Sequence, residues 1–396
     1  MNQKLAFAVK KKRNDIITTG FRGELTRLGH GLGMMDGKVE ETEGLFQVSY
    51  LWVAEILSNS SEIGIFLWRN TLLLPGRSIV SRRFVSVSPS MNSSSFLLTG
   101  FSGLEEQYPW VSIPFSFIYA MVLLGNFMVL HVIWTEPSLH QPMFYFLAML
   151  ALTDLCMGLS TVHTVLGIMW GLIQEISLDS CITQSYFIHG LSFMESSVLL
   201  PMSFDRYIAI SKPLHYSSIL TNSRIAKIGL AILGRSFFFI TPPIILLKLF
   251  RYCRPHILSH SFCLHQDLLR LACSDIRFNS YYALMLVICT LLLDALIILI
   301  SYVLIIKSVL AIASQKEQLK SFHTCISHTC AVLAFYIPII SLTMVHRFGK
   351  HLSPVVHVLM GNIYILFPPL MNPIIYSVKT QQIHNRILRL FSLKRH

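Results

Sequence analysis

The chain has 396 residues, of which 53% are hydrophobic and 13% charged, and its mean hydropathy is +0.58. This composition excludes an ordinary soluble domain and indicates a protein that crosses a membrane several times. The net charge of +12 does not indicate a nucleic-acid partner. The basic residues lie in loops and in the tail, where they suit a cytosolic face and anionic lipid. With no metal-ligand motif such as HExxH and no phosphate-binding loop, we expect neither a metal site nor an enzyme.

Residues 1–90 differ from everything after them. They carry the basic run Lys10–Arg13, and their apolar runs are broken by charges before they reach membrane-spanning length. They contain no clear signal peptide. We interpret them as an atypical, disordered N-terminal extension. Met91 resembles a second natural start, and Asn92 begins a glycosylation sequon.

Seven apolar segments follow Met91, each of roughly the 20 residues that a bilayer core requires. They cover about 110–133, 143–168, 181–208, 225–247, 280–306, 324–345 and 354–378. Each must satisfy its backbone hydrogen bonds internally, so all should be helices. The predicted fold is an all-α membrane protein, with a seven-transmembrane helix bundle over 91–378 and a short tail over 379–396.

The placement of Lys and Arg predicts the orientation. With the N-terminus outside and the C-terminus inside, twelve basic residues face the cytosol and seven the other side, five of these in the long 248–278 loop. Four of the eight cysteines then lie outside, which predicts two disulfides whose pairing the spacing leaves open. The four are Cys181, Cys253, Cys263 and Cys273.

The tail predicts a short amphipathic helix lying on the inner leaflet. Its apolar residues share one helical face, and two arginines are available for lipid phosphate. The apolar residues are Ile383, Ile387, Leu390 and Phe391, and the arginines are Arg386 and Arg389.

Charged residues inside the spans are candidate functional sites, because they are costly in lipid. Asp205-Arg206-Tyr207 ends the third span, where Arg206 could be part of a switch or could snorkel to the interface. Asp154 and Glu195 must be paired, protonated or bound to a cation. For the other two charges, Asp294 and Arg235, we expect packing or snorkelling.

Several motifs, in one order along 91–396, resemble an olfactory receptor of the class I, fish-like branch of the rhodopsin-like G-protein-coupled receptors. They are Gly125-Asn126, the 139–147 run LHQPMFYFL before Asp154, Asp205-Arg206-Tyr207, Pro213-Leu214-His215-Tyr216, the 262–267 run FCLHQD, Ser301-Tyr302, the 320–328 run KSFHTCISH and the 369–376 run PLMNPIIY. Two features depart from the family: the long N-terminal extension, and Pro201, which puts the helix geometry before Asp205 in doubt.

The resemblance implies a multi-pass plasma-membrane receptor. Such a receptor binds a small volatile or organic-acid odorant in its extracellular half and activates a stimulatory G protein, which raises cyclic AMP. It implies disulfides Cys181–Cys263 and Cys253–Cys273, and it places Asp154 and Glu195 near Asn372. Either a sodium ion held between the two acids or a proton shared by them would then offset their negative charge. The implied switch residues are Asp205, Arg206, Tyr207, Tyr302 and Tyr376.

For the ligand, Thr343 and Arg347 are four residues apart and share a helix face. The resemblance suggests that His189, His265 and Gln266 join them around a small organic acid, with Arg347 as the carboxylate anchor. The alternative for Arg347 is a solvated charge at a helix end. A rhodopsin-like receptor for a non-odorant metabolite or peptide, expressed outside the nose, also stays open.

Overall fold

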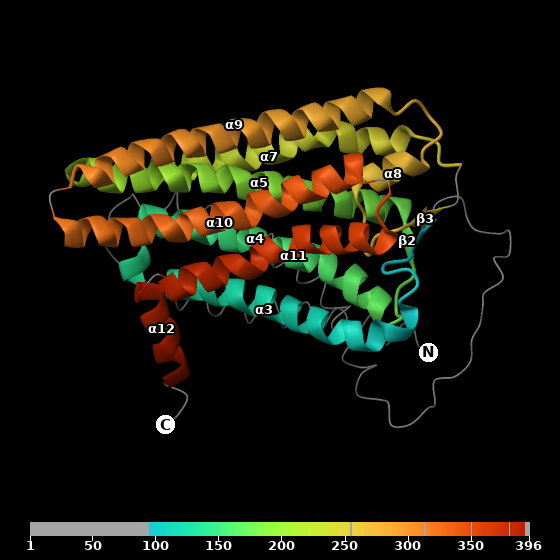
Figure 1. Ribbon diagram of the computed structural model, residues 1–396, viewed down its shortest axis with the longest axis horizontal. Coiled ribbons are helices and arrows are strands. Elements are labelled where there is room, and N and C mark those ends of the chain that lie inside the picture. Colours follow the sequence, from blue (N-terminus) through green and yellow to red (C-terminus); the bar gives the residue numbers. More distant parts are fainter. Residues whose placement is uncertain (1–94, 254–255, 313, 350, 380, 393–396) are drawn as a thin grey trace, which may run out of the picture. The chain divides into compact units, whose positions relative to one another are not determined.

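The computed structural model describes residues 95–253, 256–312, 314–349, 351–379 and 381–392. The N-terminal extension, the start at Met91 and the sequon at Asn92 therefore lie outside the described residues. Seven long helices run alongside one another (Figure 1). They are α3 (Tyr108–Thr135), α4 (Pro142–Met169), α5 (Leu178–Ser211), α7 (Asn222–Leu249), α9 (Arg277–Leu310), α10 (Gln315–Phe348) and α11 (Pro354–Lys379).

Each predicted span lies inside one of these helices. Most of the helices extend a few residues beyond the prediction, and α10 begins nine residues before it. Local sequence explains several of the starts. Pro142 occupies the first turn of α4, where its missing N–H costs nothing. The Ser177 and Thr221 side chains cap α5 and α7 by accepting from the backbone N–H of Ser180 and Arg224.

Six helices in the described part of the chain are long and apolar enough to cross a membrane: α3, α4, α7, α9, α10 and α11. The seventh, α5, is equally long but carries four charged residues and many serines, which lower its hydropathy. Its acids Glu195 and Asp205 are buried, because α5 packs against α4, α7, α9 and α10. Pro201 lies inside α5, and the helix continues through it to Ser211.

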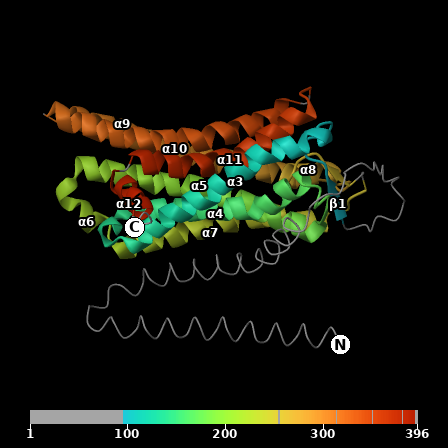
Figure 2. The ribbon, with the colours of Figure 1, turned by 90° about the horizontal axis from the view of Figure 1, so that it is seen from below.

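One end of the bundle, which we call the disulfide end, carries a three-stranded sheet and a short helix (Figure 2). Strand β1 (Ser95–Leu98) pairs antiparallel with β2 (Glu175–Ser177) and parallel with β3 (Ile257–Leu258). The short helix is α8 (His265–Leu271). At the opposite end lie the short helix α6 (Tyr216–Ile219) and α12 (Gln381–Ser392).

The structure joins Cys181 to Cys263 and Cys253 to Cys273, which is the pairing that the family resemblance implied. The first bridge ties the loop before α8 to the start of α5. Gln184, one turn further along α5, forms a second link to the same loop. Its side-chain oxygen accepts from the Cys263 backbone N–H at 2.9 Å, and its amide donates to the Thr164 hydroxyl on α4 at 2.9 Å. This loop therefore has a fixed position over the bundle.

The predicted tail helix is present as α12, and Ile383 is fully buried. Arg386, which was expected to face lipid phosphate, instead forms an ion pair with Glu136 between α3 and α4, at 2.7 Å. This ion pair ties α12 to the segment between α3 and α4.

Replacing Cys181 should destabilise the protein more than replacing a free cysteine. Losing a disulfide from a small secreted domain costs about 2–5 kcal/mol, and here it also releases the loop that Gln184 holds. Cys181→Ser should therefore lower the melting temperature of the purified protein by several degrees. The exposed, unbridged Cys289 supplies the control variant Cys289→Ser. Equal melting temperatures for the two variants would contradict the prediction.

Candidate functional site

A cavity of about 380 Å³ opens at the disulfide end, bounded by residues of α5, α7, α8, α9, α10 and α11. All five residues that the sequence analysis selected for ligand binding line it. They are His189 on α5, His265 and Gln266 on α8, and Thr343 and Arg347 on α10. They come from segments as much as 158 residues apart in the chain, so the fold brings them together.

Two of the imidazoles that line the cavity, those of His189 and His265, form hydrogen bonds. His189 accepts from the backbone N–H of His265 at 3.4 Å, and the His265 Nε2 lies 3.0 Å from the Asn279 side-chain oxygen. Asn279 in turn donates to the Pro243 carbonyl on α7. Burial lowers the pKa of His265 to about 4. The ring is therefore neutral at physiological pH, and α8 is fixed to α7 and α9.

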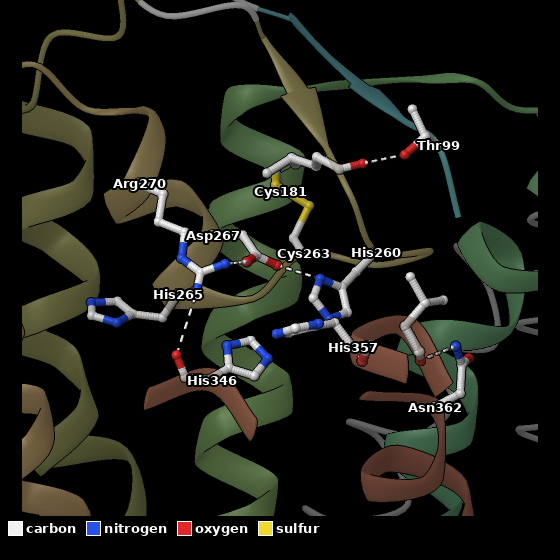
Figure 3. Close-up of polar contacts among 12 residues, drawn as sticks. Thr99, Cys181, His260, Cys263, His265, Asp267, Arg270, His346, His357 and Asn362 are labelled. Atoms are coloured by element: carbon white, nitrogen blue, oxygen red, sulfur yellow. Dashed lines mark hydrogen bonds and ion pairs between the residues drawn. A yellow bond between two sulfur atoms is a disulfide. The ribbon is translucent and has the colours of Figure 1, made fainter. Parts of the chain in front are cut away.

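Beside the cavity lies a polar cluster that the sequence analysis did not anticipate (Figure 3). Asp267 on α8 forms an ion pair with His260 at 2.6 Å and a looser one with Arg270 at 3.8 Å. The His260 ring also stacks against His346 of α10, with ring centroids 5.4 Å apart. The three-residue spacing of Asp267 and Arg270 on a helix was a usable signal. The contacts with His260 and His346 depend on the fold.

The rest of the cavity wall is mostly apolar. Phe193 lines it, together with Tyr364 and a row of α9 residues. Phe187 and Leu199 are not among the lining residues. Phe187 packs on Tyr186 and Phe237, while Leu199 is buried in the core.

Deeper in the bundle, Asp154, Glu195 and Asn372 meet as expected. The Asn372 amide donates to the Asp154 carboxylate at 2.9 Å and to Glu195 at 3.3 Å. All three side chains are buried. The second Asp154 oxygen, Oδ1, has no hydrogen-bond partner among the described residues. The cluster can therefore accept a cation or a proton.

The expectation of packing or snorkelling for Arg235 and Asp294 was wrong, because the two residues form an ion pair at 2.9 Å between α7 and α9. Ser196 of α5 donates to the same carboxylate at 3.0 Å and lies 3.1 Å from the Tyr336 hydroxyl of α10. Three helices thus meet at one buried carboxylate, and Tyr336 joins α10 to it through Ser196.

At the opposite end, Arg206 lies 3.6 Å from the Asp205 carboxylate. The hydroxyl of Tyr216 on α6 donates to the other Asp205 oxygen at 2.6 Å. Tyr302 of α9 lies 2.6 Å from the His328 ring of α10, which in turn contacts the Leu199 carbonyl. Tyr216 and His328 both fall in motifs noted in the sequence, but their roles were missed.

The remaining two switch candidates pack nearby. Tyr207 lies against the cluster of Ile305, Val309 and Cys325. Tyr376 on α11 is buried, and its hydroxyl has no hydrogen-bond partner among the described residues. The residues expected to form a switch therefore surround one end of α5.

Comparison with known proteins places this geometry in a family. The family model for olfactory receptors matches residues 115–394. Human olfactory receptor 51V1 is 84% identical over 317 residues, which are 80% of this chain and 99% of that protein. The chain belongs to the olfactory receptor family. Human olfactory receptor 51G1 is 54% identical over 307 residues, covering 78% of this chain and 96% of the relative.

A likeness to a solved structure concerns the fold alone. Squid rhodopsin matches with a TM-score of 0.59 and 18% identity, over 73% of this chain and 86% of its own. The family membership makes the protein a multi-pass receptor of the plasma membrane and a signalling protein rather than an enzyme. Its ligand is of the small-molecule class, and its partner is a G protein.

Acid should destabilise the receptor in part through His265. The folded-state pKa of about 4 lies below the usual 6.5, so the unfolded chain binds a proton that the folded receptor excludes. Stability should therefore fall as pH drops from about 6.5 towards 4. The loss of melting temperature between pH 7 and pH 5 should be smaller in His265→Gln than in the wild type. His215→Gln removes an exposed imidazole and serves as the control. An identical pH dependence in His265→Gln and the wild type would contradict this account.

Proposed function

We propose that this receptor binds a small organic acid in the cavity at the disulfide end and activates a stimulatory G protein at the opposite end. One observation carries the proposal. The five side chains chosen for carboxylate binding line the same cavity, with the Arg347 guanidinium among them. A planar guanidinium fork matches a carboxylate and stays charged when partly desolvated.

The proposal includes seven membrane crossings, with the disulfide end outside and α12 inside. The polar residues of α5 are buried against neighbouring helices, so α5 can cross without exposing them to lipid. Both disulfides lie at one end, which suits an oxidising compartment. Most basic loop and tail residues lie at the other end, as expected for a cytosolic face.

The size of the cavity favours a small ligand over a peptide. About 380 Å³ lies near the lower end of the range for small-molecule sites. The neutral imidazoles and Gln266 would orient the acid by hydrogen bonds, while Phe193 and the α9 wall would surround an aliphatic tail. This favours an acid of modest chain length as the odorant, rather than the alternative of a peptide.

For the Asp154, Glu195 and Asn372 cluster, we propose a sodium ion. The two carboxylates, which the Asn372 amide N–H group holds together, supply hard-oxygen ligands, and the Asp154 Oδ1 has no hydrogen-bond partner among the described residues. A bound cation would offset the cost of holding two buried acids ionised together. A proton shared between the acids remains the competing arrangement.

At the inner end, Asp205 would restrain Arg206 while the receptor is inactive. The 3.6 Å separation and the competing Tyr216 hydroxyl make this a loose pair, which a conformational change can release. Tyr302 and Tyr376 would hold Arg206 in the active arrangement. Tyr302 would leave His328 to do so, and the Tyr376 hydroxyl has no present hydrogen bond among the described residues to lose.

Arg347 should distinguish acids from their esters. In cells with a cyclic-AMP reporter, Arg347→Lys should weaken the response to an active carboxylic acid about tenfold, because Lys offers no bidentate fork. The methyl ester of that acid should be a poor agonist of the wild type. An agonist set of neutral alcohols and esters that is indifferent to Arg347→Ala would contradict the proposed ligand class.

Arg206 should be required for signalling but not for assembly. Arg206→Ala should reach the cell surface yet give no cyclic-AMP response to any agonist, because the proposed G-protein contact is removed. Lys227→Ala, which removes an exposed positive charge on α7 towards the same end, supplies the matched control. A normal response from surface-expressed Arg206→Ala would remove this residue from the mechanism.

A further inference from the structure

We propose that His260 carries a proton in the folded receptor and that, as a cation held between Asp267 of α8 and the first turn of α11, it positions the wall of the cavity that α8 supplies. The inference rests on the proposed function in that the agonist binds this cavity. His260 is not among the lining residues, so it acts on the ligand through α8.

The two ring nitrogens of His260 are the first argument. The residue lies in the loop between β3 and α8, and it is 1% exposed. Its Nε2 lies 3.2 Å from the backbone carbonyl of His357 on α11, and its Nδ1 lies 2.6 Å from the Asp267 carboxylate (Figure 3). A carbonyl oxygen only accepts, so Nε2 must carry the hydrogen of that bond. The ring therefore has an acceptor on each side.

The short Nδ1 contact then requires a second proton. A neutral imidazole has one donor nitrogen and one acceptor nitrogen. With the hydrogen on Nε2, a neutral His260 would direct the Nδ1 lone pair at an ionised oxygen of Asp267. Burial alone would raise the pKa of the Asp267 carboxyl, but the neighbouring basic groups, His260 first among them, hold it below its usual value. Asp267 is therefore ionised, and the second proton belongs to His260.

Titratable and charged groups face His260 from three helices. From α8 come Asp267 and Arg270, whose guanidinium lies 3.8 Å from the other oxygen of the same carboxylate. From α11 comes His357, through its carbonyl. From α10 comes His346, which stacks on His260 and whose ring nitrogens have no hydrogen-bond partner among the described residues. His346 is thus the other imidazole that could take up a proton, and the test includes it.

The packing of the ring against α11 is the second argument. Gly361 lies one turn beyond His357, and a Cβ atom at this position would be 2.9 Å from the Cδ2 of His260. The imidazole therefore lies directly against the helix at a residue that has no side chain. Its position depends on α11 as much as on α8.

Loss of the proton would change the cavity through α8. A neutral His260 can donate to the α11 carbonyl or to Asp267 but not to both, and Asp267 is buried. Asp267 directly follows His265 and Gln266, which line the cavity. A shift of α8 relative to α11 would therefore move these two groups. Proton binding and agonist binding are then linked, and each strengthens the other by the same factor.

The first measurement is the melting temperature of the purified full-length receptor without ligand. A proton that the folded state binds more tightly than the unfolded state stabilises the fold at low pH, and this stabilisation is lost as the pH rises. The melting temperature of the wild type should therefore fall between about pH 6.5 and about pH 9. The opposite effect of His265 belongs to the range below, from about 6.5 towards about 4.

The second measurement is agonist potency in cyclic-AMP reporter cells over the same range of extracellular pH. Straight-chain monocarboxylates from propanoate to octanoate serve as probes, because such acids stay ionised well above a pKa of about 4. The half-maximal concentration for the wild type should rise about tenfold from the low to the high end of the range, a typical size for coupling between two sites.

Three variants separate the proton from the packing. His260→Gln should raise the half-maximal concentration at low pH and flatten both pH profiles, because Gln takes up no proton. Asp267→Asn should also give flat profiles, because its amide can donate to a neutral His260. His351→Gln removes an exposed imidazole at the same end and should keep the wild-type profiles. If His260→Gln fails to reach the surface, Asp267→Asn decides.

Several results would overturn the inference. Flat profiles in the wild type would do so, as would wild-type slopes in both His260→Gln and Asp267→Asn. Slopes that vanish only in His346→Gln would assign the proton to His346 instead. A pH-dependent melting temperature with pH-independent potency would show that His260 stabilises the fold without positioning the cavity wall. If no carboxylate activates the wild type, the proposed ligand class is refuted, and the melting profiles alone decide whether His260 holds the proton.

Discussion

The ion pair between Arg235 and Asp294 is the interaction on which the middle of the bundle depends. A charge within an apolar segment is costly unless it is paired, and removing one partner of a buried pair typically costs about 3–5 kcal/mol. The Asp294 carboxylate also accepts from Ser196, which contacts Tyr336. One carboxylate of α9 thereby joins α5 and α7 directly, and α10 through Ser196.

Helix α5 extends this principle along its length. It bears the Cys181 bridge and Gln184 at the disulfide end, Glu195 and Ser196 in the middle, and Asp205 at the other end. Together they contact the loop before α8 and the helices α4, α6, α9 and α11. The polar residues that lower the hydropathy of α5 therefore make contacts along the helix from the cavity at the disulfide end to Asp205 at the opposite end. Helix α10 runs parallel to this line, from Thr343 past Tyr336 to His328.

The sequence predicted the helices better than it predicted which side chains contact one another. Seven long apolar runs allow few alternatives to seven helices, and the five cavity residues followed from helix spacing and family resemblance. The pairing of Arg235 with Asp294 was missed, because 59 positions separate them and neither residue indicates its partner. The α9 wall of the cavity was missed for another reason. The sequence does not distinguish an apolar residue that faces lipid from one that lines a cavity, as Leu284 does. Tyr216 was visible in a motif, but a motif does not show which side chain meets Asp205.

The most direct test is a double-variant cycle on the ion pair, with the melting temperature of surface-expressed, purified receptor as the readout. Arg235→Met should lower it markedly, because it leaves the buried Asp294 carboxylate without its partner, and Asp294→Leu should lower it because it leaves the half-buried Arg235 guanidinium unpaired within an apolar helix. The combined variant should recover much of the loss, because it leaves neither charge. Single variants as stable as the wild type, or losses that simply add in the double variant, would contradict the view that this pair holds the four helices together.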